Sequence, residues 1–106
     1  MEFTEKRVKT IDYFESDCNG TADLLVSKGY LLWSGKGDIP RIGDIVTPSY
    51  RPRPFETGKV IGYFAEDGYL GVEIEPLSGE AEWWLKQRVR ATAKLFGAEI
   101  KKVCDG

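Results

Sequence analysis

The side chains that most often carry out acid–base catalysis or bind metals are scarce in this chain. It has no histidine and only two cysteines, so the commonest general base is absent and a zinc site, which needs about four ligands, is short of them. Glu73 and Glu75 would share one face of a strand, where a pair of carboxylates can act as acid and base. Because outward strand faces are ordinarily polar, we interpret this pair as solvated. We therefore expect no enzymatic activity, no metal site and no cofactor.

Aromatic side chains are stronger candidates for contact with a partner. The chain has three Trp, five Tyr and five Phe, most of which we expect in the core. Trp83 and Trp84 are adjacent, so they would diverge by about 100° on a helix and point to opposite faces in a strand. At least one should be exposed, and an exposed Trp beside charges is typical of an interaction surface. The predicted partner surface consists of Trp83, Trp84, Tyr69, Arg51, Arg53 and Phe55.

Basic residues suggest a second kind of surface. In the segment PSYRPRP, residues 48–54, prolines pre-order the backbone around two arginines and would hold them out for an acidic partner or a phosphate. Residues 86–106 carry six Lys/Arg against two Asp/Glu, whereas residues 1–85 carry nine against fifteen. The chain is thus not uniformly basic, as general nucleic-acid binders are. Solvated surface charges remain the plainer interpretation of both groups. Contacts to nucleic acid, if it is bound, are expected from Arg51, Arg53, Lys86, Arg88, Arg90 and Lys94.

The N-terminal sequence and the cysteines bear on the compartment. MEFTEKRVKT is charged and lacks the apolar centre of a signal peptide, and no apolar run reaches the ~18 residues of a membrane span. We therefore expect a cytoplasmic protein with no membrane partner. In that compartment free thiols are favoured over a disulfide between Cys18 and Cys104, which stays open.

A β-hairpin is the best-specified element of the sequence. Asp67-Gly68 supplies the two residues of a type I′ turn between two β-rich runs. Closing the strands on this turn pairs Ile61 with Ile74, Tyr63 with Val72 and Ala65 with Leu70 on one face, which we predict to be buried. The other face pairs Val60 with Glu75, Gly62 with Glu73, Phe64 with Gly71, and Glu66 with Tyr69. An aromatic ring lying over Gly71 would compensate for its missing side chain.

The flanking segments are less regular. Ala22 to Ser27 reads as a short element that Gly29 would end, and Tyr30 to Trp33 as a short buried strand. Residues 80–96 fit a continuous helix with Trp84, Leu85 and Val89 on one face. They also fit a short helix over Glu82-Gln87 followed by a strand over residues 91–96 that continues into residues 100–103. We prefer the second assignment because a hairpin needs further strands to be stable.

The runs GDIV, GKVIGYF and YLGVEIEP, within residues 40–75, resemble the opening and central strands of Src-homology-3-like small barrels, including KOW-type and Tudor-type modules. The longer pattern through EWWLKQ and FGAEI is also similar to small proteins, of no known activity, carried by phages and other mobile elements. The resemblance implies a single mainly β domain over residues 1–106, a small barrel with short helical elements. Its barrel-like core would cover about residues 40–103 and its N-terminal extension residues 1–39. The alternative is an α+β fold with a C-terminal helix over residues 80–96.

In such barrels exposed rings line a peptide groove. The expected function is therefore non-catalytic binding of a protein or peptide partner, a second copy in a homodimer being one form of it, by a protein encoded on a mobile element. The alternative function is KOW-type nucleic-acid binding.

Overall fold

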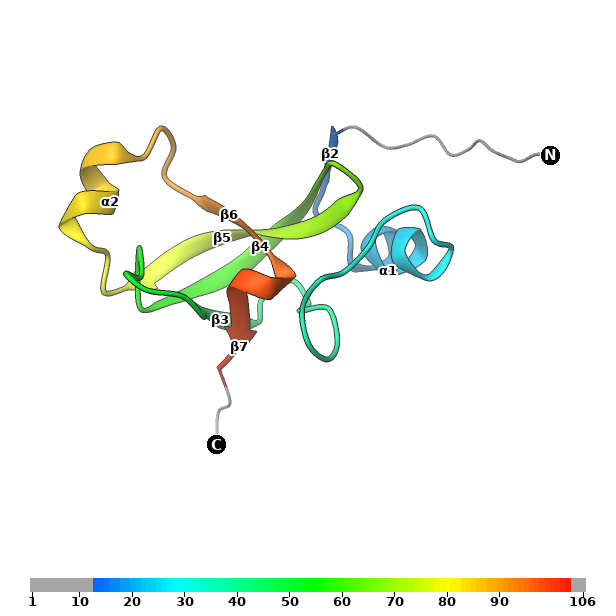
Figure 1. The fold of residues 1–106 in the computed structure, drawn as a ribbon, viewed down its shortest axis with the longest axis horizontal. Coiled ribbons are helices and arrows are strands. Elements are labelled where there is room, and N and C mark those ends of the chain that lie inside the picture. Colours follow the sequence, from blue (N-terminus) through cyan, green and yellow to red (C-terminus); the bar gives the residue numbers. More distant parts are fainter. Residues whose placement is uncertain (1–12, 104–106) are drawn as a thin grey trace.

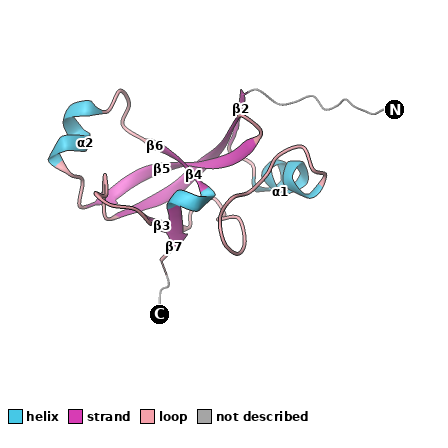
Figure 2. Ribbon diagram, viewed as in Figure 1, coloured by secondary structure: helices cyan, strands magenta, loops and turns pink. Residues whose placement is uncertain are grey.

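The computed structural model describes residues 13–103. Two long strands form a central hairpin, and short strands and helices surround it (Figures 1 and 2). In chain order the elements are β2 (Tyr13–Ser16), α1 (Asn19–Ser27), β3 (Ile45–Pro48), β4 (Thr57–Glu66), β5 (Tyr69–Ser78), α2 (Glu82–Gln87), β6 (Ala93–Phe96), the 3-10 helix η1 (Gly97–Glu99) and β7 (Ile100–Lys102).

The strands form one antiparallel sheet in the order β6-β5-β4-β3-β7. β2 pairs with the second half of β4, beyond the residues that β3 covers. β6 and β7 stand at the two ends of this order although only η1 separates them in the chain, so the sheet must bend until its ends approach each other. Within residues 13–103 β6 and β7 do not pair, so no closed barrel is formed there. The prediction of a mainly β fold with short helices is confirmed.

The alternative of one helix over residues 80–96 is wrong. α2 ends at Gln87, and Arg88 has extended backbone angles, with φ −65° and ψ 146°. From Ala93 the chain is a strand in which Ala93 and Leu95 are buried against the sheet and Lys94 is less covered. The alternation of side chains along β6, which a helix cannot satisfy, decides between the two assignments.

The hairpin turns at Asp67-Gly68, as predicted. Their φ angles of 55° and 83° are the left-handed values that a type I′ turn requires. The predicted pairing is also confirmed next to the turn, from Glu66 opposite Tyr69 back to Gly62 opposite Glu73. The turn chemistry therefore fixes the register over the first five pairs.

A β-bulge changes the register further from the turn. The irregularity lies between Val60 and Gly62, and Ile74 pairs with Val60 instead of Ile61. The predicted pairs Ile61/Ile74 and Val60/Glu75 are therefore wrong. The inserted residue puts Val60 on the core face, where it is fully buried, and leaves Ile61 partly exposed.

The core lies against the hairpin face that Val60, Tyr63, Val72 and Ile74 share. The other buried residues of the core come from the hairpin itself, from α1 and the loop after it, from β3 and the loop after it, and from β6 and β7: Ala22, Leu31, Val46, Phe55, Ala65, Leu70, Ala93, Leu95 and Ile100. On the opposite face the ring of Phe64 lies over Gly71, and a Cβ added to Gly71 would collide with it. The predicted aromatic cover of Gly71 is confirmed.

α1 is fixed to the sheet by the hydroxyl of Tyr63. This hydroxyl lies 2.8 Å from Asn19 Oδ1, at the start of α1, and 2.6 Å from the carbonyl oxygen of Pro40. Asn19 Oδ1 also accepts a hydrogen bond from the Ile42 backbone N–H at 2.9 Å. At the other end of α1, Gly29 has a φ of 85° and ends the helix as predicted.

The Tyr63→Phe variant should lose about 1–2 kcal/mol of unfolding free energy, because Pro40 then keeps a poorly satisfied buried carbonyl. Burial raises the pKa of Tyr63, an effect only partly opposed by Arg41. A raised folded-state pKa stabilises the fold below the unfolded pKa of ~10 and loses that contribution as pH rises through the folded value. Urea unfolding of both proteins at neutral and strongly alkaline pH should show the difference shrinking. A variant as stable as wild type at neutral pH would contradict this role.

The predicted strand over Tyr30 to Trp33 is not formed. Leu32 makes a single parallel bridge to Tyr69, through hydrogen bonds with Gly68 and Leu70 at 2.9 Å each. From Gly71 onward this edge of β5 is occupied by β6, so a longer strand has no place to pair. Leu31 is buried, whereas Leu32 is exposed.

Among the described residues, no helix has the length and apolar character that crossing a membrane requires.

Candidate functional site

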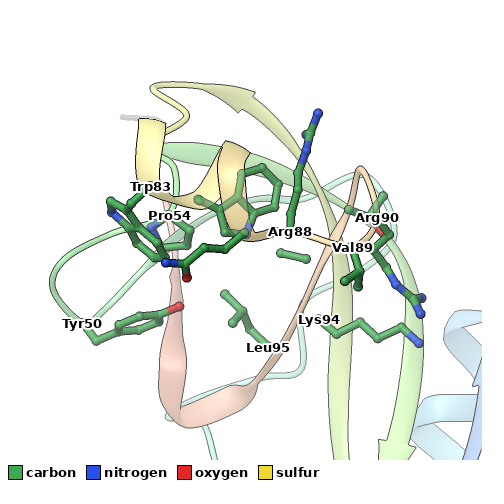
Figure 3. Close-up of a pocket in the computed structure, with 12 residues that line it drawn as sticks. Tyr50, Pro54, Trp83, Arg88, Val89, Arg90, Lys94 and Leu95 are labelled. Atoms are coloured by element: carbon green, nitrogen blue, oxygen red, sulfur yellow. The ribbon is translucent and has the colours of Figure 1, made fainter.

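A groove of about 440 Å³ lies between α2, strand β6 and the loop that joins β3 to β4 (Figure 3). Here it is named the aromatic groove. Its lining residues are Tyr50, Pro54, Trp83, Trp84, Gln87, Arg88, Val89, Arg90, Thr92, Ala93, Lys94 and Leu95.

One wall of the groove is α2, which spans Glu82–Gln87 as predicted. Its charges suit the helix dipole, with Glu82 in the first turn and Lys86 in the last. The backbone N–H of Ala81, just before α2, donates to the carbonyl of Pro54 at 2.9 Å. The ring of Trp84 meets that of the buried Phe55 edge-on, with centroids 6.0 Å apart. These two contacts fix α2 against the β3–β4 loop.

The β3–β4 loop forms the facing wall and is held at both ends. Ser49 donates its backbone N–H to the backbone carbonyl of Glu99 at 2.8 Å and its hydroxyl to the Ala98 carbonyl at 3.1 Å. At the other end the backbone N–H of Glu56 donates to the backbone carbonyl of Ser78 at 2.9 Å. Tyr50 is therefore presented from an anchored loop. Burial, and secondarily the charge of Glu99, raise the pKa of Tyr50, so its hydroxyl stays protonated at neutral pH.

The floor of the groove comes from β6. Ala93 and Leu95 are nearly fully buried there and present an apolar surface. The Thr92 hydroxyl donates to Glu73 Oε2 at 2.7 Å and fastens the chain before β6 to strand β5. Glu73 is consequently half-buried, and the predicted solvation of the Glu73 and Glu75 pair holds only for Glu75.

The two tryptophans differ as their adjacency predicts. Trp83 is 38% exposed, whereas Trp84 is largely covered by its contacts with the core. The prediction that at least one of them is exposed is confirmed. Both line the aromatic groove.

The structure separates the other predicted aromatic residues from the tryptophans. Phe55 is fully buried beneath Trp84 and offers no surface to a partner. Tyr69 is exposed, but it begins β5 whereas α2 follows the end of β5 (Figure 1). Nine residues of strand at ~3.3 Å each place Tyr69 about 30 Å from that end. Trp83, Trp84 and Tyr69 therefore do not form one surface.

The predicted basic residues are also divided. Arg88, Arg90 and Lys94 line the groove, while Lys86 points elsewhere and pairs with Glu82 at 3.5 Å. Arg51 is exposed outside the groove. Only the C-terminal basic group thus contributes to the groove, through Arg88, Arg90 and Lys94, and the arginines of the proline-rich loop do not.

The prolines do not hold Arg53 out into solvent. Its side chain is only 22% exposed and its Nη1 lies 2.9 Å from Glu56 Oε1, three residues along the chain. The nearby carboxylate draws the guanidinium back onto the loop.

The three cations in the groove have different environments. Arg88 lies 3.3 Å from Glu80 Oε2, and its guanidinium is 5.1 Å from the centre of the Trp84 ring. Lys94 Nζ lies 2.6 Å from Glu15 Oε2. Arg90 makes no hydrogen bond or ion pair with any residue from 13 to 103. The positive charge most available to a ligand is that of Arg90.

Sequence reasoning missed seven of the groove residues: Tyr50, Pro54, Gln87, Val89, Thr92, Ala93 and Leu95. Tyr50 lies within residues 48–54, the proline-rich segment already predicted to contact a partner, so the sequence could have indicated it as a binding residue. Val89 lies between two arginines and is 93% exposed. Its place in the groove could not be predicted, because it depends on the end of α2 at Gln87.

A second hollow, of about 530 Å³, is larger but less suited to binding. It is lined mainly by loop residues and lysines, and it contains no aromatic ring. The hydroxyls of Ser34 and Ser49 at its edge are already engaged with the backbone of Ala98.

Other chemistry has little support in the described chain. Within residues 13–103 no cluster of three or more His, Cys, Asp or Glu could hold a metal ion. Hydrogen bonds from Thr21 and Gly20 lower the pKa of the exposed Cys18 thiol, which is free. Cys104 lies outside the described residues.

Comparisons with family models, with curated proteins and with solved structures give no match. The function proposed below therefore rests on the aromatic groove itself.

Proposed function

We propose that this protein is a non-catalytic binding module that takes a peptide, or a segment of a protein, into the aromatic groove. The observation that carries the proposal is the exposed Trp83 beside Tyr50 and Pro54, above an apolar floor. Trp and Tyr side chains contribute large contact areas at low entropic cost and dominate interaction hot spots. Their anchoring through Ala81, Ser49 and Phe55 means that little order has to be gained on binding.

Nucleic-acid binding is the second candidate, because the groove combines rings with Arg88, Arg90 and Lys94. Rings and cations together are the usual site for single strands. Two observations favour a protein partner instead. Glu80 and Glu15 lie against Arg88 and Lys94 and would face phosphates, and neither Arg51 nor Arg53 lines the groove.

The Src-homology-3-like barrel belongs to the same proposal. It is supported by the bent sheet, in which η1 joins strands from the two ends of the sheet order. It is also supported by the hairpin that carries the residues on which the resemblance depends.

The test is selection of binders from a random-peptide phage library by the full chain, followed by calorimetry of the selected peptides. Tyr50→Ala should weaken their binding about tenfold, since Tyr is a frequent hot-spot residue. A Tyr30→Ala variant removes a Tyr ring that is more exposed than that of Tyr50 and lies away from the groove, and it should bind as wild type does. A library that yields no binders, or peptides that tolerate Tyr50→Ala, would contradict the proposal.

Two further measurements separate the alternatives. Fluorescence anisotropy with single- and double-stranded oligonucleotides at ~50 mM salt should show no binding if the partner is a protein, because phosphate contacts are strongest at low salt. Light scattering determines whether the partner is a second copy of the chain, since a homodimer would appear without any added ligand.

A further inference from the structure

The two ends of the aromatic groove differ in chemistry. Figure 3 shows Tyr50, Pro54 and Trp83 at one end, and Arg90 and Lys94 at the other, with Leu95 between them. A ligand that fills the groove therefore contacts aromatic side chains at one end and cationic side chains at the other. The ligand must accordingly carry an apolar group and an anionic group at matching positions.

The loop over residues 88–92 holds the cationic end in place. Arg88 is fixed before Arg90 by Glu80 and by the Trp84 ring, and Thr92 is fixed after it by Glu73. Between these anchors Val89 is almost fully exposed, and the guanidinium of Arg90 has no carboxylate partner within residues 13–103. Arg90 is thus an available charge on an anchored loop.

The rest of the chain enhances the contrast. Residues 1–85 carry nine Lys/Arg against fifteen Asp/Glu, so an acidic ligand is repelled by most of the protein and attracted to the C-terminal part. Such complementarity raises association rates and excludes wrong partners more than it raises affinity. Arg also matches carboxylates well, because its planar donors can bind both oxygens.

We propose that the groove recognises an acidic protein segment that places a carboxylate on Arg90 and a large apolar side chain against Trp83 and Tyr50. This inference rests on the proposed function. It adds the charge of the ligand and states which end of the groove its acidic and apolar groups occupy. A phosphate backbone is a different ligand class: it carries a charge at every nucleotide and would bring phosphates beside Glu80 and Glu15, whereas a protein segment can place a single carboxylate on Arg90.

The test is the same phage selection carried out in parallel with wild type, Arg90→Glu and Lys36→Glu. Lys36 is exposed on a loop outside the groove, so its variant makes the same change in net charge. Wild type and Lys36→Glu should enrich peptides that combine a large apolar residue with Asp or Glu. Arg90→Glu should keep the apolar preference and lose the acidic one. Replacing Glu by Gln and Asp by Asn in a selected peptide should weaken its binding to wild type about tenfold, and its binding to Arg90→Glu not at all.

The outcomes separate the two proposals. Peptides that bind but show no acidic preference, or an acidic preference unaffected by Arg90→Glu, overturn this inference and leave the binding module intact. A selection that yields no peptide overturns both. An oligonucleotide that binds the groove with a loss on Arg90→Glu, where peptides do not, overturns the inference in favour of nucleic acid. Circular dichroism confirms that each variant is folded.

Discussion

Replacing Ile74 by Ala should lower the unfolding free energy by about 2–5 kcal/mol, the range for removing a fully buried large aliphatic side chain. Ile74 has no exposed surface and packs at the centre of the core that the β4–β5 hairpin shares with β6. Neighbouring strands are fixed by their pairing with the hairpin and cannot close the resulting cavity completely. Chemical denaturation followed by tryptophan fluorescence measures the change.

Ile61→Ala is the matched control, because it deletes the same atoms from the same hairpin. Ile61 is the residue that the β-bulge inserts and is partly exposed, so its loss should cost less than half as much. Equal costs at Ile61 and Ile74 would mean that the two residues face each other, as an uninterrupted register requires. The bulge would then be wrong.

The hairpin shows how far local rules extend. Asp67-Gly68 determines the turn, and the turn determines pairing as far as Gly62, because each pair follows from the one before it. The insertion at Ile61 cannot be deduced from alternation, which assumes one residue opposite one residue. A glycine inside a strand is a recognised sign of a bulge, and Gly62 stands at this one. The signal was present, but it does not say which neighbour is inserted.

The aromatic groove shows the opposite case. α2 could be predicted because a short helix leaves room for the further strand that the hairpin needs, and the adjacency of Trp83 and Trp84 predicted that at least one of them is exposed. The partners of Trp83 in the groove could not, because Tyr50 and Pro54 reach it through contacts of the β3–β4 loop with Ala81 and η1. Sequence reasoning also could not separate Tyr69 from the tryptophans. Tyr69 lies at the end of the hairpin that is far from α2, because it begins β5 and α2 follows the end of β5.

Trp83→Ala should weaken binding of the selected peptides by about 30-fold, or ~2 kcal/mol, the threshold of an interaction hot spot. The ring is the most exposed of the aromatic side chains in the groove and offers the apolar end its largest contact area. The fold should change little, because the neighbouring Trp84 makes the edge-on contact with Phe55. Calorimetric titration and chemical denaturation of the same variant measure the two effects separately.

Trp84→Ala reverses the pattern and serves as the control for Trp83→Ala. Its ring is largely covered, lying on Phe55 and beneath the Arg88 guanidinium, so its loss should cost about 3 kcal/mol of stability, the low end for removal of a buried Trp. Because α2 is attached to the loop partly through this ring, binding falls as well, but only together with stability. A Trp83 variant that binds as wild type does, in a protein that still selects peptides, would place the ligand elsewhere than on this ring. If instead both variants lose stability equally, the two rings share one structural role, and the exposed face of α2 is not a binding surface.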